Sequence, residues 1–432
     1  MQRPLLSARL LSATAAVAVV AVSTAVAVLW PTFRAPSLSP LPGAAVAASS
    51  ENSIRAAEGP KQVAPEAPGT TSETPSNRWG ASYFPNVPVI DQNGRMNFPT
   101  RHPLNQTERS RALVGAADVI LGLELTDFWG TVHSYRDQLV RTSQSITKPG
   151  AKLISITAGD LFLRSNYQDF ERYPEVDLAI AADAEATLPS LIEAVKRLIT
   201  PDRRRALDDR GAKLAAGSRD SLERARTEAT YAWDASPIST ARLVMETFAQ
   251  IKGLDWSLVA SSGNVSNWPN RLWPMEKHYH WLGASGGYGV GYGAPASVGA
   301  ALANRDLGRF SVSIQSDGDL MYAPGVLWTA AKHKIPLLAV MHNNRGYHQE
   351  VMHVQRLSNF RNRVASLGGD MGPIGTSIEN PDIEYHKLAE SMGWWAKGPI
   401  KDPAQLGAAI KEAVAVVKSG QPALVNVWTQ PR

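Results

Sequence analysis

Short apolar runs alternate with helix-like segments over the second half of the chain. Runs rich in Val, Ile, Leu and Ala cover residues 256–260, 335–341 and 422–427, and another ends at Ile314. Runs of this length, bounded by glycine, proline and polar residues, are typical of buried strands. Strands that alternate with helices predict a parallel sheet in a doubly wound α/β domain.

The same alternation is present between residues 81 and 200. Apolar runs at 88–90, 117–123 and 152–156 predict three more strands. The segment 186–198 has helical periodicity, with apolar residues at Leu188, Leu191, Ile192, Val195 and Leu198. We therefore predict two doubly wound, parallel-sheet (Rossmann-like) α/β domains.

A highly charged segment separates the two predicted domains. Before Asp234, residues 201–236 carry eight Lys or Arg and six Asp or Glu among few large apolar side chains. This composition predicts a solvated helix between a central domain at 81–200 and a second domain at 237–432. Ser239 follows a Ser-Pro turn and is the predicted N-cap of the next helix.

The N-terminal part of the chain differs from the rest. Residues 10–30 form an uncharged run of 21 residues behind a short segment that carries Arg3 and Arg9. We interpret 1–47 as a hydrophobic leader with three alternatives. It is a secretory signal with a cleavage site at 45–47, an N-terminal membrane anchor, or sequence from an incorrect gene start.

Residues 48–80 are rich in Pro, Glu, Ser and Thr and are predicted to be a disordered linker.

Composition excludes several kinds of function. The 432 residues carry a net charge of +5 without a cluster of Lys and Arg interleaved with aromatic residues, so nucleic acid is not an expected partner. Cysteine is absent, which excludes disulfides, thiol catalysis and Cys-ligated zinc.

The densest candidate chemistry lies between residues 315 and 350. One predicted strand meets Asp317 at a glycine turn, a helix-like segment follows at about 324–334, and the next strand ends at Asn344. A right-handed βαβ unit places both strand ends at one edge of the sheet, which brings Asp317 and Asn344 together. Carboxylate, amide and carbonyl oxygens are ligands that Mg²⁺ or Ca²⁺ prefers, and Mg²⁺ with few protein ligands usually completes its shell with phosphate oxygens. The implied ligand is a diphosphate.

This arrangement resembles the thiamine diphosphate (ThDP) signature of the acetolactate synthase, benzoylformate decarboxylase and pyruvate decarboxylase superfamily. The shared pattern is Asp-Gly, about two dozen residues, then Asn-Asn. The resemblance implies three metal ligands: Asp317, Asn344 and the Gly346 carbonyl. It places Gly318 and Asp319 beside the diphosphate of the cofactor.

Two positions depart from the family pattern. The family usually has glycine where this chain has Ser316, and a small residue where it has Asp319. These differences alter the expected phosphate contacts and leave the metal ligands unchanged. Apart from the resemblance, the segment also fits the strand, turn, helix and strand of another kind of α/β enzyme.

The resemblance implies further residues around the cofactor. Val290 has the position of a bulky apolar residue that bends the cofactor between its two rings, although valine is smaller than the usual Met, Leu or Ile. Tyr347 opens a predicted helix whose N-terminal amides would help to hold the diphosphate, and the neighbouring His348 is either a substrate contact or a helix cap. The remaining implied cofactor-binding residues lie in two glycine-containing loops: Gly263, Asn264, Ser266, Tyr288 and Gly289.

The segment 81–200 resembles the central domain that some superfamily members use to bind FAD or ADP and others use only as a scaffold. It lacks a GxGxxG phosphate loop, so FAD binding has no support from the sequence. Arg101 and His102 are interpreted as loop anchors rather than ligands.

The implied activity is that of a ThDP- and Mg²⁺-dependent, acetolactate synthase-like lyase or transferase. It would decarboxylate or ligate small 2-oxo acids as a homo- or hetero-oligomer formed through the cofactor domain. The family is usually cytoplasmic, whereas a genuine leader would make this chain exported or membrane-anchored.

In the superfamily, a glutamate of an N-terminal pyrimidine-binding domain activates the cofactor. We expect that domain to be absent from this chain, so the catalytic residue is not assigned, and the chain is expected to be truncated or dependent on a partner. Two alternatives stay open: a catalytically inactive ThDP-binding or regulatory homologue, and an unrelated nucleotide-binding α/β protein.

Overall fold

The computed structural model of the protein describes residues 86–92, 94–125, 127–137, 142–159, 174–261, 265, 267–283, 290–363 and 375–431, together with the backbone of Val17–Ala21. The chain divides into two compact units, Met1–Thr24 with Gly80–Arg432, and Ala25–Trp79. The second unit lies outside the described residues. Within the described part of the chain, no helix is both long enough and apolar enough to cross a bilayer.

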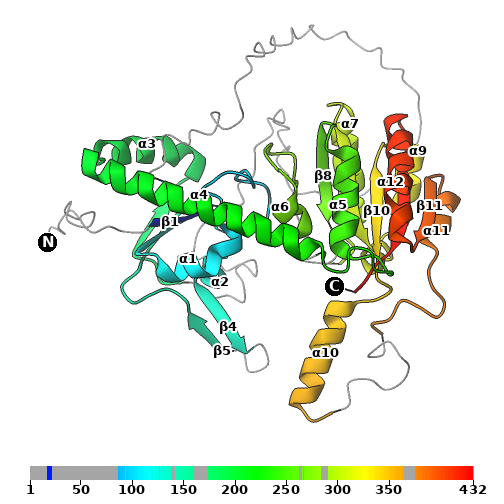
Figure 1. Cartoon of the computed structure of the whole chain (residues 1–432), viewed down its shortest axis with the longest axis horizontal. Helices are drawn as coiled ribbons and strands as arrows, with labels where there is room; N and C mark the ends of the chain where they lie inside the picture. The colour runs from blue at the N-terminus through cyan, green and yellow to red at the C-terminus, as the bar shows by residue number, and fades with distance from the viewer. Residues whose placement is uncertain are drawn as a thin grey trace, which may run out of the picture. The chain divides into compact units, whose positions relative to one another are not determined.

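The first of two five-stranded sheets has only parallel strands (Figure 1). Its order is β2, β1, β3, β6, β7, with bounds Val89–Asp91, Val17–Ala21, Val119–Leu123, Lys152–Thr157 and Leu178–Ala181. Buried residues of β3 and β6 pack with α1 (Ser110–Ala116) and α3 (Ala184–Arg197) in one apolar core. The strands and the helix predicted from the apolar runs of this half are therefore confirmed.

Strand β1 comes from the stretch that we interpret as a leader. Its backbone pairs with β2 on one side and β3 on the other, with Val19 opposite both Val89 and Leu121. The leader itself stays a prediction.

Two short helical elements, one long helix and a hairpin complete this half. The hairpin pairs β4 (His133–Asp137) with β5 (Thr142–Ser145) in antiparallel register. The other elements are η3 (Thr107–Arg109) and α2 (Phe128–Val132), which precede the hairpin, and α4 (Pro201–Ala229), which follows α3. Thr200 caps α4 by accepting a hydrogen bond from Arg203 N, and Pro201 occupies its first turn, where proline costs no hydrogen bond.

The second sheet is also parallel, with the order β11, β12, β10, β9, β8 (Figure 1). The bounds are Trp395–Ile400, Ala423–Trp428, Leu338–Asn343, Phe310–Ser316 and Trp256–Ser261. All six residues of β10 and the first six of β9 are buried, as expected for central strands covered on both faces.

Two apolar cores cover the two faces of this sheet. One contains α5 (Thr240–Ile251) and α12 (Pro403–Lys418), and the other contains α7 (Gly293–Arg305), α9 (Val326–Lys332) and α11 (Tyr385–Ser391). Ser239 caps α5 by accepting from Arg242 N, which confirms the predicted N-cap. The prediction of a doubly wound α/β fold is therefore confirmed. The remaining helices are α6 (Trp268–Leu272), α8 (Asp317–Leu320) and α10 (His348–Phe360).

Candidate functional site

The carboxyl ends of β9 and β10 form one edge of the second sheet. His342 of β10 pairs with Ser316 of β9, so Asp317 and Asn344 begin the two turns that leave this edge side by side. Asp317 Oδ2 accepts a hydrogen bond from Arg345 N at 2.5 Å. The structure thus brings Asp317 against the turn that contains Gly346, as the βαβ pattern predicts. The predicted glycine turn itself is one turn of helix, α8.

Asp317 is a buried carboxylate, with an exposed fraction of 2%. Burial raises the pKa of Asp317 to about 6, while the backbone amides of Gly318, Arg345 and Gly346 act in the opposite direction. Within the described residues, Asp317 forms no ion pair. A buried carboxylate normally has a cationic or metal partner, so this one fits a site for a cation.

The Asn344 side chain is held in one orientation. Its Nδ2 donates to His342 Nε2 and to the Pro431 carbonyl, each at 3.3 Å. Its Oδ1 accepts from Gly346 N at 3.2 Å. Because both Nδ2 and Oδ1 have partners, the side-chain oxygen Oδ1 of Asn344 stays on the side of the Gly346 turn.

His342 is a site residue that the sequence did not identify. The side chain is buried, and burial lowers the pKa of His342 to about 4, with a smaller contribution from His348. Its Nε2 accepts from Asn344, so the proton of the neutral ring is on Nδ1, which lies 2.7 Å from Thr429 Oγ1. The available signal was a titratable residue inside an otherwise apolar strand.

Asp319 holds the start of α7. Its Oδ1 accepts from Gly291 N at 2.6 Å, and its Oδ2 accepts from Gly293 N at 3.1 Å and from Gln315 Nε2 at 2.7 Å. Gly291 has a φ of +94°, which favours glycine. The carboxylate of Asp319 is therefore directed at the start of α7 and satisfies the amide of Gly291 in the preceding loop and that of Gly293, the first residue of the helix.

Gly318 and Tyr347 are in close contact. A Cβ atom at Gly318 would lie 2.3 Å from Tyr347 Cε1, and Tyr347 Oη donates to the Gly318 carbonyl at 3.3 Å. Only glycine allows the aromatic ring to approach this backbone. The next residue, His348, has its Nε2 3.0 Å from the Asn344 carbonyl, a local contact within the turn.

The comparisons with known proteins agree with this geometry. Residues 261–427 match the family described as "Thiamine pyrophosphate enzyme, C-terminal TPP binding domain". This segment belongs to the thiamine diphosphate-binding domain family. It extends from the last residue of β8 into β12 and includes the Asp317 and Asn344 turns.

The relatives of this chain differ in how much of it they match. The acetolactate synthase large subunit IlvX of Mycobacterium tuberculosis is 35% identical over 118 residues, which are 27% of this chain and 21% of the relative. A benzoylformate decarboxylase of Pseudomonas aeruginosa is 24% identical over 349 residues, 79% of this chain and 55% of the relative. The chain therefore spans about half the length of this second curated relative, and the match to IlvX covers less.

A solved structure shares the fold. The Rhodococcus jostii RHA1 thiamine diphosphate-dependent 4-hydroxybenzoylformate decarboxylase superposes with a TM-score of 0.52 and 21% sequence identity. The superposition covers 80% of this chain and 56% of that protein.

The remaining ThDP-site predictions have different outcomes. Gly263, Asn264, Ser266, Tyr288 and Gly289 lie outside the described residues. Val290 is at the described end of its loop, beside Gly291, and is 51% exposed. The described residues contain no cluster of three His, Cys, Asp or Glu side chains placed for a metal, so any metal at the Asp317 turn would need amide and carbonyl ligands. That role for Asp317, Asn344 and Gly346 stays a prediction.

In the first sheet, a carboxylate of the protein lies at the carboxyl end of β3. Glu124 follows β3, and its carboxylate accepts from Thr157 Oγ1 at 2.8 Å, from Ala158 N at 3.1 Å and from Ala184 N at 3.0 Å. The Ala184 amide lies at the N-terminus of α3, where helices in such sheets often hold a phosphate. Glu124 thus occupies donors that a nucleotide would otherwise use.

Proposed function

We propose that the chain binds ThDP together with Mg²⁺ and takes part in acetolactate synthase-like chemistry, the decarboxylation or carboligation of 2-oxo acids. The observation that carries the proposal is the Asp317 carboxylate, which is buried, forms no ion pair among the described residues and faces the Asn344 turn. Superfamily membership supplies the cofactor class.

The residues at this edge fit a magnesium ion. Asp317 offers a carboxylate, Asn344 an amide oxygen oriented by His342, and Gly346 a backbone carbonyl. All three are hard oxygen donors, and Mg²⁺ held by so few protein groups takes phosphate oxygens and water as its other ligands. Bound ThDP would supply those oxygens and an electron sink for the carbon that loses or gains a bond.

The other residues of the site would orient the cofactor. Asp319 fixes the loop that carries Val290, and Val290 would rest between the two rings. Tyr347 covers Gly318 and limits the space over the Asp317 turn. These contacts would set the distance between the ring-supporting loop and the metal-binding turn before the cofactor arrives.

The substrate class comes from the relatives. Two proteins that match this chain are named as benzoylformate and 4-hydroxybenzoylformate decarboxylases, and another as an acetolactate synthase subunit. We therefore propose a 2-oxo acid as substrate. Cofactor binding without turnover is the alternative for the same site, and a turnover assay separates the two.

Calorimetric titration of ThDP tests the proposal. Wild-type protein should bind ThDP in the presence of Mg²⁺, and Asp317→Ala should bind at least about tenfold more weakly because an anionic ligand is lost. Asp306→Ala is a matched control, because Asp306 is exposed and its one ion pair among the described residues is with its neighbour Arg305. Equal ThDP binding by Asp317→Ala and wild type would refute the site. Release of CO₂ from pyruvate or benzoylformate would then distinguish an enzyme from a binding protein.

A further inference from the structure

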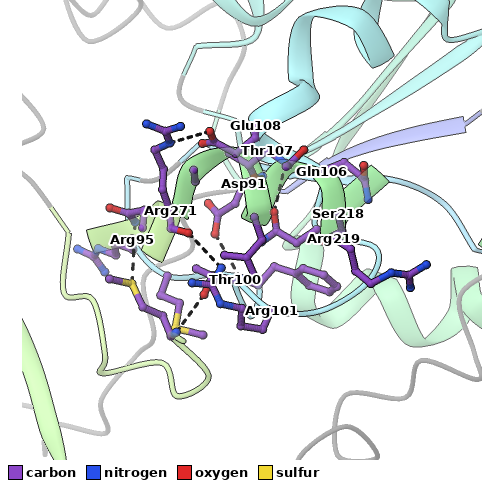
Figure 2. Close-up of a pocket in the computed structure, with 18 residues that line it drawn as sticks. Asp91, Arg95, Thr100, Arg101, Gln106, Thr107, Glu108, Ser218, Arg219 and Arg271 are labelled. Carbon is purple, nitrogen blue, oxygen red and sulfur yellow. Dashed lines mark hydrogen bonds and ion pairs between the residues drawn. The ribbon is translucent and has the colours of Figure 1, made fainter. Parts of the chain in front are cut away.

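A cavity of about 130 Å³ is lined by residues other than those of the Asp317 turn. Figure 2 shows its lining. Three segments line it: the loop after β2 (residues 91–108), the second half of α4 (residues 218–225), and the end of α6 with the turn that follows (residues 270–275). The lining begins at Asp91, the last residue of β2, which pairs in parallel with β1. The cavity therefore adjoins the carboxyl end of a strand, where parallel sheets commonly bind ligands.

Arg271 is the neutralised cation of this cavity. Its Nε lies 3.0 Å from Glu108 Oε2, its Nη2 lies 2.5 Å from Glu228 Oε2, and its guanidinium stacks on the Trp268 ring at 4.4 Å. Two carboxylates and an aromatic face satisfy this charge, so Arg271 serves as part of the wall.

Arg101 is in a different electrostatic environment from Arg271. Its Nη1 donates to the Arg271 carbonyl at 3.1 Å, which anchors the loop as predicted. Within the described residues, no carboxylate pairs with it. Burial lowers the pKa of Arg101 to about 10, and the like charge of Arg226 acts in the same direction. The guanidinium therefore stays charged at neutral pH in a poorly solvated place, a costly arrangement unless an anion is present.

The nearby carboxylates are turned to other partners. Asp91 Oδ2 accepts from Asn97 N at 3.0 Å and from Phe98 N at 3.3 Å, and its Oδ1 accepts from Asn97 Nδ2 at 3.1 Å. Glu108 pairs with Arg271. Arg95 and Arg219 also line the cavity, so its residues carry four positive charges against two negative charges.

We propose that this cavity binds a small oxyanion, either an inorganic phosphate or a short carboxylate, on the guanidinium of Arg101. A guanidinium presents parallel N–H donors that match the oxygens of both groups. A cavity of this volume has room for several water molecules, which suits a phosphate or an acetate-sized acid. It is below the roughly 300 Å³ or more of typical cofactor pockets, which favours a small ligand.

Binding should also stabilise the fold. The oxyanion would hold together the loop after β2, α4 and the turn after α6, which all contribute to the cavity wall. A ligand that binds only the folded state raises the free energy of unfolding. The melting temperature should therefore rise with oxyanion concentration at constant ionic strength.

The test is a pair of titrations on the full chain, one with orthophosphate and one with acetate, each with chloride as the reference salt. We expect saturable heat and a rise in melting temperature with at least one oxyanion, and the two arms identify which. Arg101→Gln should bind at least about tenfold more weakly because a charge-assisted pair is lost. Arg205→Gln, which removes an exposed arginine from the same α4 helix, should stay within about twofold.

Two further variants keep the result interpretable. Ser218→Asp adds a carboxylate to the α4 wall, so it should abolish oxyanion binding while the protein stays folded in circular dichroism. Asp317→Ala should leave the oxyanion titration unchanged, which separates this cavity from phosphate binding at the ThDP site. Absence of saturable binding to the wild type, equal binding by folded Arg101→Gln, or loss of binding in Asp317→Ala would each overturn the proposal.

Discussion

Asp319 Oδ1 lies 2.6 Å from the backbone nitrogen of Gly291 and connects two turns that are 28 residues apart in the sequence. The same carboxylate accepts from Gly293, the first residue of α7. The glycine-rich loop is thus fixed to the end of β9 by one side chain. In a ThDP site, this contact would set the position of Val290 relative to the Asp317 turn.

Removal of this carboxylate should loosen the loop. Asp319→Ala leaves two backbone amides and the Gln315 amide without their acceptor, at a cost of about 1–3 kcal/mol for each buried group that stays unsatisfied. We expect lower stability in urea unfolding and weaker ThDP binding. Asp319→Asn keeps one acceptor oxygen and should lose less. Asp306→Ala is the surface control. If Asp319→Ala loses no more stability than Asp306→Ala, the role of Asp319 is contradicted.

His342 should affect metal affinity through Asn344. His342→Leu removes the acceptor of Asn344 Nδ2, so the amide can rotate and its Oδ1 leaves the Gly346 turn part of the time. Loss of a group that orients a ligand typically reduces metal affinity by about 10- to 100-fold. The Mg²⁺ concentration needed for half-maximal ThDP binding should rise accordingly. His333→Leu, at an exposed histidine, should leave this Mg²⁺ concentration unchanged. If His342→Leu and His333→Leu need the same Mg²⁺ concentration, His342 does not orient Asn344 for the metal.

The pH dependence of stability gives an independent measurement of His342. Its pKa is lowered from 6.5 to about 4 by burial, so protonation is easier in the unfolded state. The associated stability is present above pH 6.5 and is lost as the pH falls toward 4, up to about 3 kcal/mol. His342→Leu lacks this term, so its stability deficit relative to wild type should shrink over that window. If the urea midpoints of wild type and His342→Leu change with pH in parallel, His342 does not titrate in this way.

Sequence patterns predicted the strands that matter for the site and missed other parts of the fold. The runs that became β9 and β10 are long, apolar and bounded by clear turns, and hydrophobic periodicity is sensitive to such buried strands. The run Leu178–Ala181 is mostly exposed, and β11 carries glycine and proline. Neither has the pattern of a buried strand, so β7 and β11 were not predicted.

Site residues were predictable only where a motif marks them. Asp317, Asn344 and Gly346 belong to a spacing pattern, and the parallel sheet brings them together. His342 depends on Thr429, which is 87 residues away in the sequence, and no local pattern connects them. The contacts of Asp319 with Gly291 and Gly293 were not predicted for a related reason, because these partners are also distant in sequence. Its place beside the diphosphate stays a prediction.

Val290 should act on the cofactor and not on the metal. Its side chain is 51% exposed, so Val290→Ala should change stability by less than about 0.5 kcal/mol. Any activity on a 2-oxo acid should fall, while the Mg²⁺ requirement for ThDP binding stays near that of wild type. Val290→Leu, which restores the size usual in the family, should retain activity. Equal activity of wild type and Val290→Ala would exclude a supporting role.

The contact between Gly318 and Tyr347 predicts a coupled pair of mutations. In Gly318→Ala, the new Cβ would lie 2.3 Å from the Tyr347 ring, so the ring or the Asp317 turn must move. Overpacking of this kind typically costs about 1–3 kcal/mol. Gly325→Ala is the matched control, because a Cβ there meets nothing within 4 Å.

Tyr347→Leu removes the ring and should leave room for the new methyl group. The double variant Gly318→Ala with Tyr347→Leu should therefore be more stable than the sum of the single losses predicts, with a coupling energy between about 0.5 and 3 kcal/mol. Urea unfolding of the four proteins gives this coupling directly. Additive losses would mean that the ring moves away without strain and that glycine at 318 is required for another reason, such as close approach of a diphosphate to its amide.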